Sequence, residues 1–418
     1  MESYHIQGGS PIEGTYSAKG AKNAALPIFA ATIAVPGIHH LSNCPNISDL
    51  SSMYCILKEL GATIIKDGST VTVDSTKVDS YKVPTKLMKE MRSSVFLMGA
   101  LLSRCGEASI CKPGGCKIGK RPIDIHITAL EQLGYKMIGD DESINFKKEH
   151  LNPGIINLPF PSVGATENII LASIHMNGIV TIKNCAKEPE IVDLVQFLNK
   201  CGAQIIGAGT GTIYIVGTAN LYSADYDIMG DRIEAATYLM AAAGTKGCLE
   251  VNHINPRYLM PVTTALEKMG CKITKTDNKI VLQGPQKLKS CGQITTGPYS
   301  QYPTDCQPQL MSLCSVAKGK SVITETIFEN RFAHGIELNK MGGNIEISQK
   351  NAIINGVDFL HGENVESKDL RGGAALIIAG LMAEGETNIC GIQHICRGYE
   401  DIDKNLKKLG GKIERISD

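Results

Sequence analysis

One thiol of this chain stands among cations in a glycine-rich segment, residues 111–122. The thiol is Cys116, and the nearby cations are Lys112, Lys117, Lys120 and Arg121. Neighbouring cations favour the thiolate form of a cysteine, and glycine lets backbone N–H groups come close to an anion. The segment therefore fits either a reactive sulfur in an anion-binding loop or a mobile basic loop whose cysteine has no role.

Charged and polar residues also stand at the heads of several apolar, helix-like segments. A cation at a helix N-terminus opposes the helix dipole, so it needs another reason to be there, and binding of an anion is one. A carboxylate at the same place also suits ordinary helix capping. We expect these heads to bind several anionic groups. The charged and polar residues are Lys22, Asn23, Arg92, Asp231, Arg232, Asp305, Asp369 and Arg371, and Val163 and Gly164 stand at the head of one further helix.

Two sets of glycines recur in step along the chain and indicate a sixfold repeat. One set follows amphipathic, helix-like segments, and its members are Gly61, Gly134, Gly202, Gly270, Gly342 and Gly410. The other set precedes short β-branched segments, and its members are Gly37, Gly106, Gly178, Gly247, Gly319 and Gly385. Each unit reads as a buried apolar helix, a strand, an outer helix and further strands. Six units predict an α/β fold with two domains of three units each.

The second unit departs from the repeat. Gly106 and Gly134 are 28 residues apart, whereas the corresponding spacing in the other units is 23 to 25. The extra residues fall where Cys116 lies. Because an insertion in one copy of a regular scaffold points to function, we interpret the Cys116 loop as a lid.

Composition excludes several classes of partner. Lysine plus arginine equals aspartate plus glutamate, 42 of each in 418 residues, so no net field attracts nucleic acid. No long apolar run and no apolar signal segment at the N-terminus is present, which predicts no membrane insertion. Fourteen cysteines without a CxxC pair predict reduced thiols in the cytoplasm and no metal site.

Nearly the whole chain resembles the UDP-N-acetylglucosamine enolpyruvyl transferases of the EPSP synthase family. The resemblance rests on the strings GAKNAALP, MRSSVFLMG, PGGCKIGKRPIDIHI, PSVGATENI, YPTDCQPQ, ETIFENRF, DLRGGAAL and HICRGYE. It implies a two-domain inside-out α/β barrel with no metal or organic cofactor. Residues 22–229 would form one domain and residues 1–21 with 230–418 the other, with the active site in the cleft between them.

The resemblance also implies a reaction. The enolpyruvyl group of phosphoenolpyruvate moves to the 3′-hydroxyl of UDP-N-acetylglucosamine and phosphate is released, the first committed step of peptidoglycan synthesis. Cys116 would donate a proton to C3 of phosphoenolpyruvate and would be the target of covalent inhibition by fosfomycin. Asp305 would act as general base near the 3′-hydroxyl, and Asp369 would help to move the second proton.

Binding roles follow from the same resemblance. Phosphoenolpyruvate would meet Lys22, Arg121 and Arg397 near its phosphate and Arg371 at its carboxylate. The UDP-sugar would meet Asn23, Arg92, Arg121, Pro122, Ile123, Asp124, Ile125, Ser162, Val163, Gly164, Asp305 and Ile327. Within that set, Arg121, Pro122 and Ile125 would hold the uracil and Ser162 to Gly164 the diphosphate. Phe160 stands where some family members have a lysine, so this chain departs from the family at one diphosphate contact.

Two other functions remain open at this point. A catalytically retired relative would bind the UDP-sugar without turnover, and a shikimate-phosphate enolpyruvyl transferase would share the fold and the chemistry. Retention of Cys116, Asp305 and Arg397, with the other implied catalytic residues, argues against the first alternative. The Cys116 loop and the PSVGAT string argue against the second.

Overall fold

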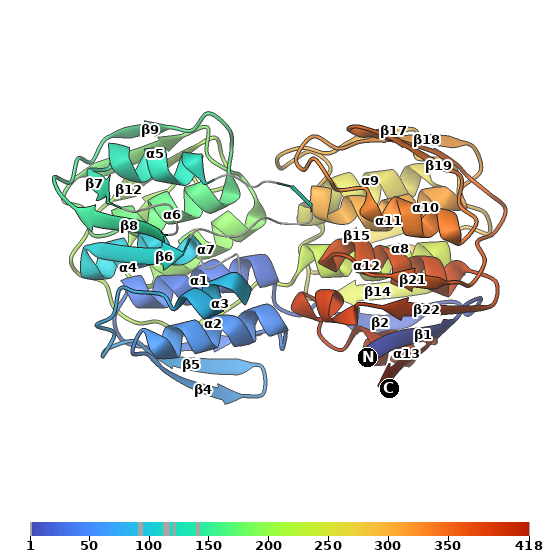
Figure 1. The fold of residues 1–418 in the computed structure, drawn as a ribbon, viewed down its shortest axis with the longest axis horizontal. Helices are drawn as coiled ribbons and strands as arrows, with labels where there is room; N and C mark the ends of the chain where they lie inside the picture. Colours follow the sequence, from blue (N-terminus) through green and yellow to red (C-terminus); the bar gives the residue numbers. More distant parts are fainter. Residues whose placement is uncertain (1, 91–94, 112–117, 120–122, 139–142, 418) are drawn as a thin grey trace. The chain divides into compact units, whose positions relative to one another are not determined.

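The computed structural model describes residues 2–90, 95–111, 118–119, 123–138 and 143–417 (Figure 1). It divides into two compact units. Unit 1 contains Met1–Lys19, Cys116–Lys120 and Gly230–Asp418, and unit 2 contains Gly20–Gly115 and Arg121–Met229. Among the described residues, no helix combines the length and the apolar character needed to cross a membrane.

Unit 2 alternates helices and strands along the chain. Its helices are α1 (Lys22–Ala34), α2 (Ser48–Glu59), α3 (Thr85–Glu90), α4 (Leu97–Cys105), α5 (Asp124–Gln132), α6 (Val163–Ser173) and α7 (Pro189–Lys200). Its strands are β3 (Ile38–Ser42), β4 (Thr63–Asp67), β5 (Thr70–Asp74), β6 (Glu107–Cys111), β7 (Tyr135–Met137), β8 (Ser143–Lys148), β9 (Ile155–Asn157), β10 (Ile179–Lys183), β11 (Gln204–Ile206), β12 (Thr212–Val216) and β13 (Tyr226–Asp227).

Unit 1 repeats the pattern and includes the N-terminal strands. Its helices are α8 (Arg232–Gly244), α9 (Met260–Lys268), α10 (Gln307–Ser315), α11 (Ala333–Lys340), α12 (Leu370–Met382) and α13 (Ile402–Lys408). Its 3₁₀ turns are η2 (Pro256–Leu259), η3 (Thr304–Cys306) and η4 (Ile392–Arg397). Its strands are β1 (Glu2–Gln7), β2 (Gly14–Ser17), β14 (Cys248–Asn252), β15 (Lys272–Thr276), β16 (Lys279–Gln283), β17 (Gln293–Thr295), β18 (Lys320–Thr324), β19 (Ile345–Ser348), β20 (Asn351–Asn355), β21 (Asn364–Glu366), β22 (Glu386–Cys390) and β23 (Lys412–Ser417).

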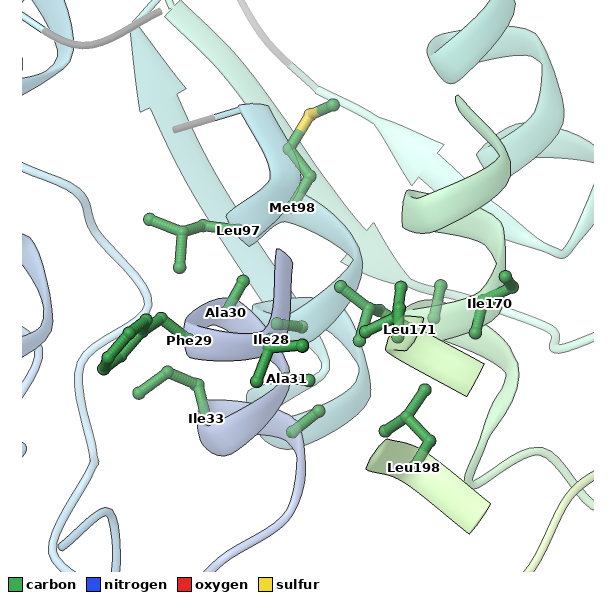
Figure 2. Packing of buried hydrophobic residues seen from close by; sticks show 14 of the residues in the cluster. Ile28, Phe29, Ala30, Ala31, Ile33, Leu97, Met98, Ile170, Leu171 and Leu198 are labelled. Atoms are coloured by element: carbon green, nitrogen blue, oxygen red, sulfur yellow. The ribbon is translucent and has the colours of Figure 1, made fainter. Parts of the chain in front are cut away.

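The apolar helices lie in the cores of the two units. In unit 2 they are α1, α4 and α6, and in unit 1 they are α8, α10 and α12; each is buried along most of its length. Alanine is common in α1 and α8, where it combines high helix propensity with room for close packing. Figure 2 shows the packing in the core of unit 2, where side chains from α1, α4, α6 and α7 meet. The remaining long helices are amphipathic and bury one side.

Each sheet repeats one arrangement. In the sheet ordered β11-β12-β10-β9, the strand that follows a buried helix, β10, pairs antiparallel with β12 and parallel with β9. The described strands form five such four-stranded sheets and one three-stranded sheet, β6-β8-β7. In that smaller sheet, Lys82 forms an isolated parallel bridge with Ser109 of β6 at the place where the other sheets have a fourth strand. The predicted α/β fold of six repeated units is therefore confirmed.

The sixth sheet is completed by the beginning of the chain. Its order is β21-β22-β1-β23, so β1 fills the inner position that in the other sheets belongs to a strand of the local hairpin. The next strand, β2, pairs with β14. Residues 2–7 and 14–17 are thus built into two sheets of unit 1.

The glycines of the repeat have a conformational reason. All six that follow an outer helix have positive φ, between 89° and 102°, which is typical of the residue that ends a helix. Five of the six that precede a strand also have positive φ. At the sixth position the left-handed residue is Lys246, and Gly247 instead lies so close to the carbonyl oxygen of Ile12 that a side chain has no room.

Candidate active site

In unit 1, two carboxylates at the heads of buried helices are joined by one arginine. Asp305 lies in η3, directly before α10, and its Oδ1 accepts a hydrogen bond from Nη2 of Arg331 at 2.9 Å. Nη1 of the same guanidinium lies 3.8 Å from Oδ1 of Asp369. The Arg331 side chain is only 3% exposed, so burial strengthens its hold on both carboxylates.

The two aspartates differ in their local role. Oδ1 of Asp369 caps α12 by accepting from the backbone N–H groups of Arg371 at 3.1 Å and Gly372 at 3.0 Å. Asp231 caps α8 in the same way. Asp305 does not cap α10, whose N-cap is Cys306. The capping role considered from the sequence is therefore correct for Asp231 and Asp369 and wrong for Asp305.

Arg371 is buried beside this pair, with its Nη2 atom 3.6 Å from Oδ2 of Asp305. Its guanidinium also lies over the ring of Tyr399 at 5.2 Å. The Tyr399 hydroxyl oxygen is in turn 2.8 Å from Oγ1 of Thr237 and accepts a hydrogen bond from Nε2 of Gln309 at 3.2 Å. The network therefore connects α8, α10 and α12. Among the described residues, Nε and Nη1 of Arg371 have no hydrogen-bond partner. Buried donors of this kind are unfavourable until an acceptor reaches them.

A buried glutamate positions the neighbouring segments. Oε1 of Glu325 accepts from the backbone N–H of Ile327 at 2.8 Å, and its Oε2 accepts from the Thr304 hydroxyl at 3.0 Å. Glu325 thus connects the predicted sugar-side residue Ile327 with the turn that carries Asp305. Arg397 ends η4, is half-buried, and belongs to a turn that packs against α12.

In unit 2, Lys22 is the first residue of α1. Its Nζ lies 2.8 Å from Oδ2 of Asp49, in the first turn of α2, and both side chains are largely buried. Asn23 follows it and is half-buried. The ion pair orients a lysine whose charge the helix dipole disfavours at this position.

The heads of α5 and α6 come together in the same unit. Ile123 is the N-cap residue of α5, and Asp124 and Ile125 begin the helix. Ser162 caps α6 by accepting from the N–H of Ala165 at 3.3 Å, and Val163 and Gly164 begin that helix. His126 of α5 fills the space beside Gly164. The structure therefore places Ile125, from the predicted uracil residues, and the predicted diphosphate residues on adjacent helix ends.

Four predicted site residues lie outside the described part of the chain: Arg92, Cys116, Arg121 and Pro122. The prediction of a lid falls on the same stretch. The nearest described residues after Cys116 are Ile118 and Gly119, which count with unit 1. The Ile118 carbonyl accepts from the N–H of Asn330 at 3.0 Å, and Gly119 packs so closely on Glu329 that a side chain would collide with it. This contact lies directly before Arg331.

Sequence reasoning missed the residues that position the site. Arg331, Glu325 and Asp49 act through contacts between segments 21 to 38 residues apart, and no spacing rule predicts such contacts. The only signal for Arg331 and Glu325 was membership in the string ETIFENRF, and Asp49 lies in none of the strings that carry the resemblance. Among the described residues, no group of three or more His, Cys, Asp or Glu side chains could hold a metal ion.

Solved structures define the class of protein to which this fold and site belong. The structure aligns over its whole length with the enolpyruvyl transferase NikO from Streptomyces tendae, at a TM-score of 0.90 and 25% identity, covering 99% of that chain. It aligns with EPSP synthase from Acinetobacter baumannii at a TM-score of 0.79 and 20% identity, with all of both chains covered. The class is therefore the two-unit α/β fold of the enolpyruvyl transferases.

Residues 6–406 match the family described as EPSP synthase (3-phosphoshikimate 1-carboxyvinyltransferase), and the chain belongs to this family. It is 46% identical over 416 residues to UDP-N-acetylglucosamine 1-carboxyvinyltransferase 2 of Caldanaerobacter subterraneus subsp. tengcongensis, with all of both chains covered. It is 44% identical to UDP-N-acetylglucosamine 1-carboxyvinyltransferase of Finegoldia magna, covering 100% of this chain and 99% of that relative.

Proposed function

We propose that this protein transfers the enolpyruvyl group of phosphoenolpyruvate to the 3′-hydroxyl of UDP-N-acetylglucosamine and releases phosphate. One observation carries the proposal: relatives named UDP-N-acetylglucosamine 1-carboxyvinyltransferase are 42% to 46% identical to the chain from end to end. The arrangement of Asp305, Arg331 and Arg371 supports the same chemistry, because it holds a carboxylate beside buried cationic donors.

The reaction has an addition and an elimination. In the addition, the 3′-oxygen bonds to C2 of phosphoenolpyruvate, the hydroxyl proton goes to a base, and C3 takes up a proton. In the elimination, C3 gives up a proton and the bond from C2 to the phosphate oxygen breaks. The products are an enol ether at the 3′-oxygen and free phosphate, so protons and electron pairs balance.

Asp305 is the base that we assign to the hydroxyl. Arg331 holds one of its oxygens, Oδ1, and this fixes the direction in which the other oxygen points. Arg371 takes the carboxylate of phosphoenolpyruvate, because its buried N–H groups suit a two-point contact with a carboxylate. Lys22, Arg121 and Arg397 serve the phosphate region, and Asn23 serves the UDP-sugar.

The proton steps at C3 involve two further residues. Cys116 is assigned as the acid that protonates C3, and it is the site where fosfomycin would attach covalently. Asp369 is assigned to help move the proton that C3 gives up in the elimination, although its Oδ1 already caps α12. Arg92, Arg121 and Pro122 complete the UDP-sugar contacts, together with the ends of α5 and α6.

A cytoplasmic location follows from the substrates and from the thiols. Phosphoenolpyruvate and UDP-sugars are intracellular metabolites, and all thirteen cysteines in the described part of the chain are free. The proposal therefore places the enzyme in the cytoplasm, at the start of peptidoglycan synthesis.

Phosphate release from phosphoenolpyruvate tests the proposal. The assay compares the wild type with Cys116→Ser, with and without UDP-N-acetylglucosamine, and uses shikimate 3-phosphate as the competing acceptor. We expect release that depends on the UDP-sugar and is lost or strongly reduced in the variant. Release by the variant at the wild-type rate would show that Cys116 is not the essential acid. A preference for shikimate 3-phosphate would show that the UDP-sugar is not the acceptor. Binding of UDP-sugar without any release would favour a retired enzyme.

A further inference from the structure

One buried histidine of unit 2 has no place in the chemistry described so far. His126 lies in the first turn of α5 and is 8% exposed. Its Nδ1 atom is 2.8 Å from Nδ2 of Asn168, a fully buried residue of α6. The protonation of this ring can be worked out from the contacts of Asn168.

The backbone determines which way the Asn168 amide faces. Its Oδ1 accepts from the N–H of Gly99 at 2.8 Å, and its Nδ2 donates to the carbonyl of Val95 at 3.0 Å. Exchanging the amide oxygen and nitrogen would set donor against donor and acceptor against acceptor. The second hydrogen of Nδ2 therefore points at His126, and Nδ1 of the histidine must accept it.

A histidine that accepts at Nδ1 carries its proton on Nε2 when it is neutral. Burial favours the neutral ring and lowers its pKa to about 4, although nearby Asp124 partly opposes this shift. The contact with Asn168 acts in the same direction, because an added proton on Nδ1 would face the amide hydrogens. At neutral pH the ring is thus an uncharged donor with its one N–H at Nε2.

This N–H lies beside the beginning of α6. A Cβ atom placed on Gly164 would be 3.0 Å from Cε1 and 3.3 Å from Nε2 of His126, so the absence of a side chain gives the ring its space. Val163 and Gly164 are the first two residues of this eleven-residue helix, and their N–H groups have no acceptor within it. No hydrogen-bond partner of Nε2 occurs in the part of the chain that the structure describes.

We propose that His126 donates Nε2–H to the diphosphate of the UDP-sugar, and that Asn168 is the residue that positions this donor. The inference rests on the proposed function, which brings a diphosphate to Ser162, Val163 and Gly164. It also explains how the site works with half-exposed Phe160 where some family members have a lysine. The diphosphate meets the positive end of α6 and a neutral donor in place of that side-chain cation.

Three substitutions of His126 separate donation from packing. His126→Gln places an amide N–H near the position of Nε2, His126→Asn reaches only the position of Nδ1, and His126→Phe removes both nitrogens. We expect the dissociation constant of UDP-N-acetylglucosamine to rise about 10-fold or more in the Phe and Asn variants, the effect of losing one hydrogen bond to a charged group. The Gln variant should recover most of the affinity. The KM for phosphoenolpyruvate at saturating UDP-sugar should stay close to the wild-type value in all three.

The outcomes distinguish this inference from the proposed function. Calorimetry on the wild type comes first, and a wild type that does not bind the UDP-sugar would overturn both. If the wild type binds and the Phe variant binds equally well, only the role of His126 falls. If all three variants lose affinity equally, the ring has a packing role and the donor is disproved.

The role of Asn168 has its own measurement. In the wild type, ¹⁵N NMR of His126 should show an unprotonated Nδ1 and a protonated Nε2 at neutral pH. Asn168→Asp turns the partner of Nδ1 into an acceptor and should move the proton to Nδ1, with a loss of UDP-sugar affinity similar to that of His126→Phe. A proton on Nδ1 in the wild type would contradict the assignment even if the variant fails to fold.

Discussion

Arg331 joins the carboxylates at the heads of two buried helices, and the site in unit 1 depends on its geometry. It contacts Oδ1 of Asp305 at 2.9 Å and approaches Asp369 at 3.8 Å. A general base must be held in position as well as ionised, because misplacement by about 1 Å can cost roughly 100-fold in rate. Arg331 is therefore a positioning residue for the base in the proposed reaction.

Replacement of this arginine tests that role. Arg331→Met keeps much of the side-chain volume and removes both contacts, so we expect kcat to fall roughly 100-fold while the dissociation constant of the UDP-sugar changes little. Arg415→Met is the matched control, since Arg415 pairs with Glu2 at the surface of the same unit and should leave kcat unchanged. An Arg331→Met enzyme with wild-type kcat would show that Asp305 does not need the contact.

The outcome for Asp305 and Asp369 shows where residue-level prediction succeeds and fails. The sequence placed both at the heads of buried helices. Asp305 is 14 residues before Gly319, and Asp369 is two residues before Arg371, which is itself 14 residues before Gly385. The sequence could not tell a cap from an ion pair. That difference depends on whether a short 3₁₀ turn precedes the helix, as η3 does for α10. The partner Arg331 comes from another segment, so its contact is visible only after folding.

At the scale of elements, the repeat glycines were predictable because they end helices in a left-handed conformation that favours glycine. Gly134 and Gly202 both have such a conformation, with φ of +89° and +94°. They differ in what surrounds them. A side chain at Gly134 would collide with the backbone carbonyl of His150, whereas one at Gly202 would first meet the ring of Tyr222, which is 60% exposed.

These two glycines give a matched pair of substitutions. Gly202→Ala should lower the free energy of unfolding by about 1–2 kcal/mol, the cost of a left-handed alanine, since the exposed tyrosine can move aside and the carbonyl oxygen of Asn220, 3.1 Å from the added carbon, needs to yield only slightly. Gly134→Ala should cost clearly more, because the carbonyl oxygen of His150 lies only 1.8 Å from the added carbon and has to shift much further. Denaturant unfolding of both variants measures the difference, and equal losses would mean that the backbone near His150 yields easily.

Helix α8 contains a buried acid whose titration affects stability. Glu234 lies in its first turn, and its Oε2 accepts from the N–H of Lys19 at 3.0 Å. Burial, followed by repulsion from Asp231, raises its pKa from 4.5 to about 8. The folded state thus keeps a proton that the unfolded state releases, and the associated stability is lost as pH rises from about 4.5 to about 8.

Glu234→Gln keeps an acceptor for Lys19 and abolishes this titration. In the wild type this titration lowers the unfolding free energy by up to about 1.4 kcal/mol per pH unit within that range. The variant should lack this decline. The unfolding free energy of the variant, relative to that of the wild type, should therefore increase as pH rises. Denaturant unfolding across the range measures this, with Glu267→Gln at the surface as control. Parallel curves for the wild type and Glu234→Gln would contradict the assignment.

At the scale of the molecule, the sequence repeat predicted six units but not how the last one is completed. Composition and periodicity treat each unit alike, whereas β1 replaces the inner hairpin strand of the sixth sheet. Only the family resemblance indicated that the first residues join the second half of the chain. Pairing between strands from opposite ends of a chain occurs only once and is set by the folded structure, so it leaves no periodic signal in the sequence.

This closure predicts that the chain tolerates circular permutation. Glu2 is paired with Ser417, so β1 and β23 are antiparallel neighbours whose ends a short Gly/Ser linker can join. New termini at Gly68, in the β4–β5 turn, would leave every strand its partners, and we expect a folded permutant with wild-type turnover. Deletion of residues 1–7 should instead destabilise unit 1 severely, because it removes buried Tyr4 and Ile6. A deletion variant as stable as the wild type would show that β1 is dispensable.

The chemical structure of the product tests the proposed transfer of the enolpyruvyl group. The full-length protein is incubated with phosphoenolpyruvate and UDP-N-acetylglucosamine, and the sugar nucleotide is then examined by NMR and mass spectrometry. We expect a UDP-sugar with an enolpyruvyl group on its 3′-oxygen, formed in equal amount with phosphate. Unmodified UDP-sugar beside released phosphate, or a sugar modified at another oxygen, would contradict it.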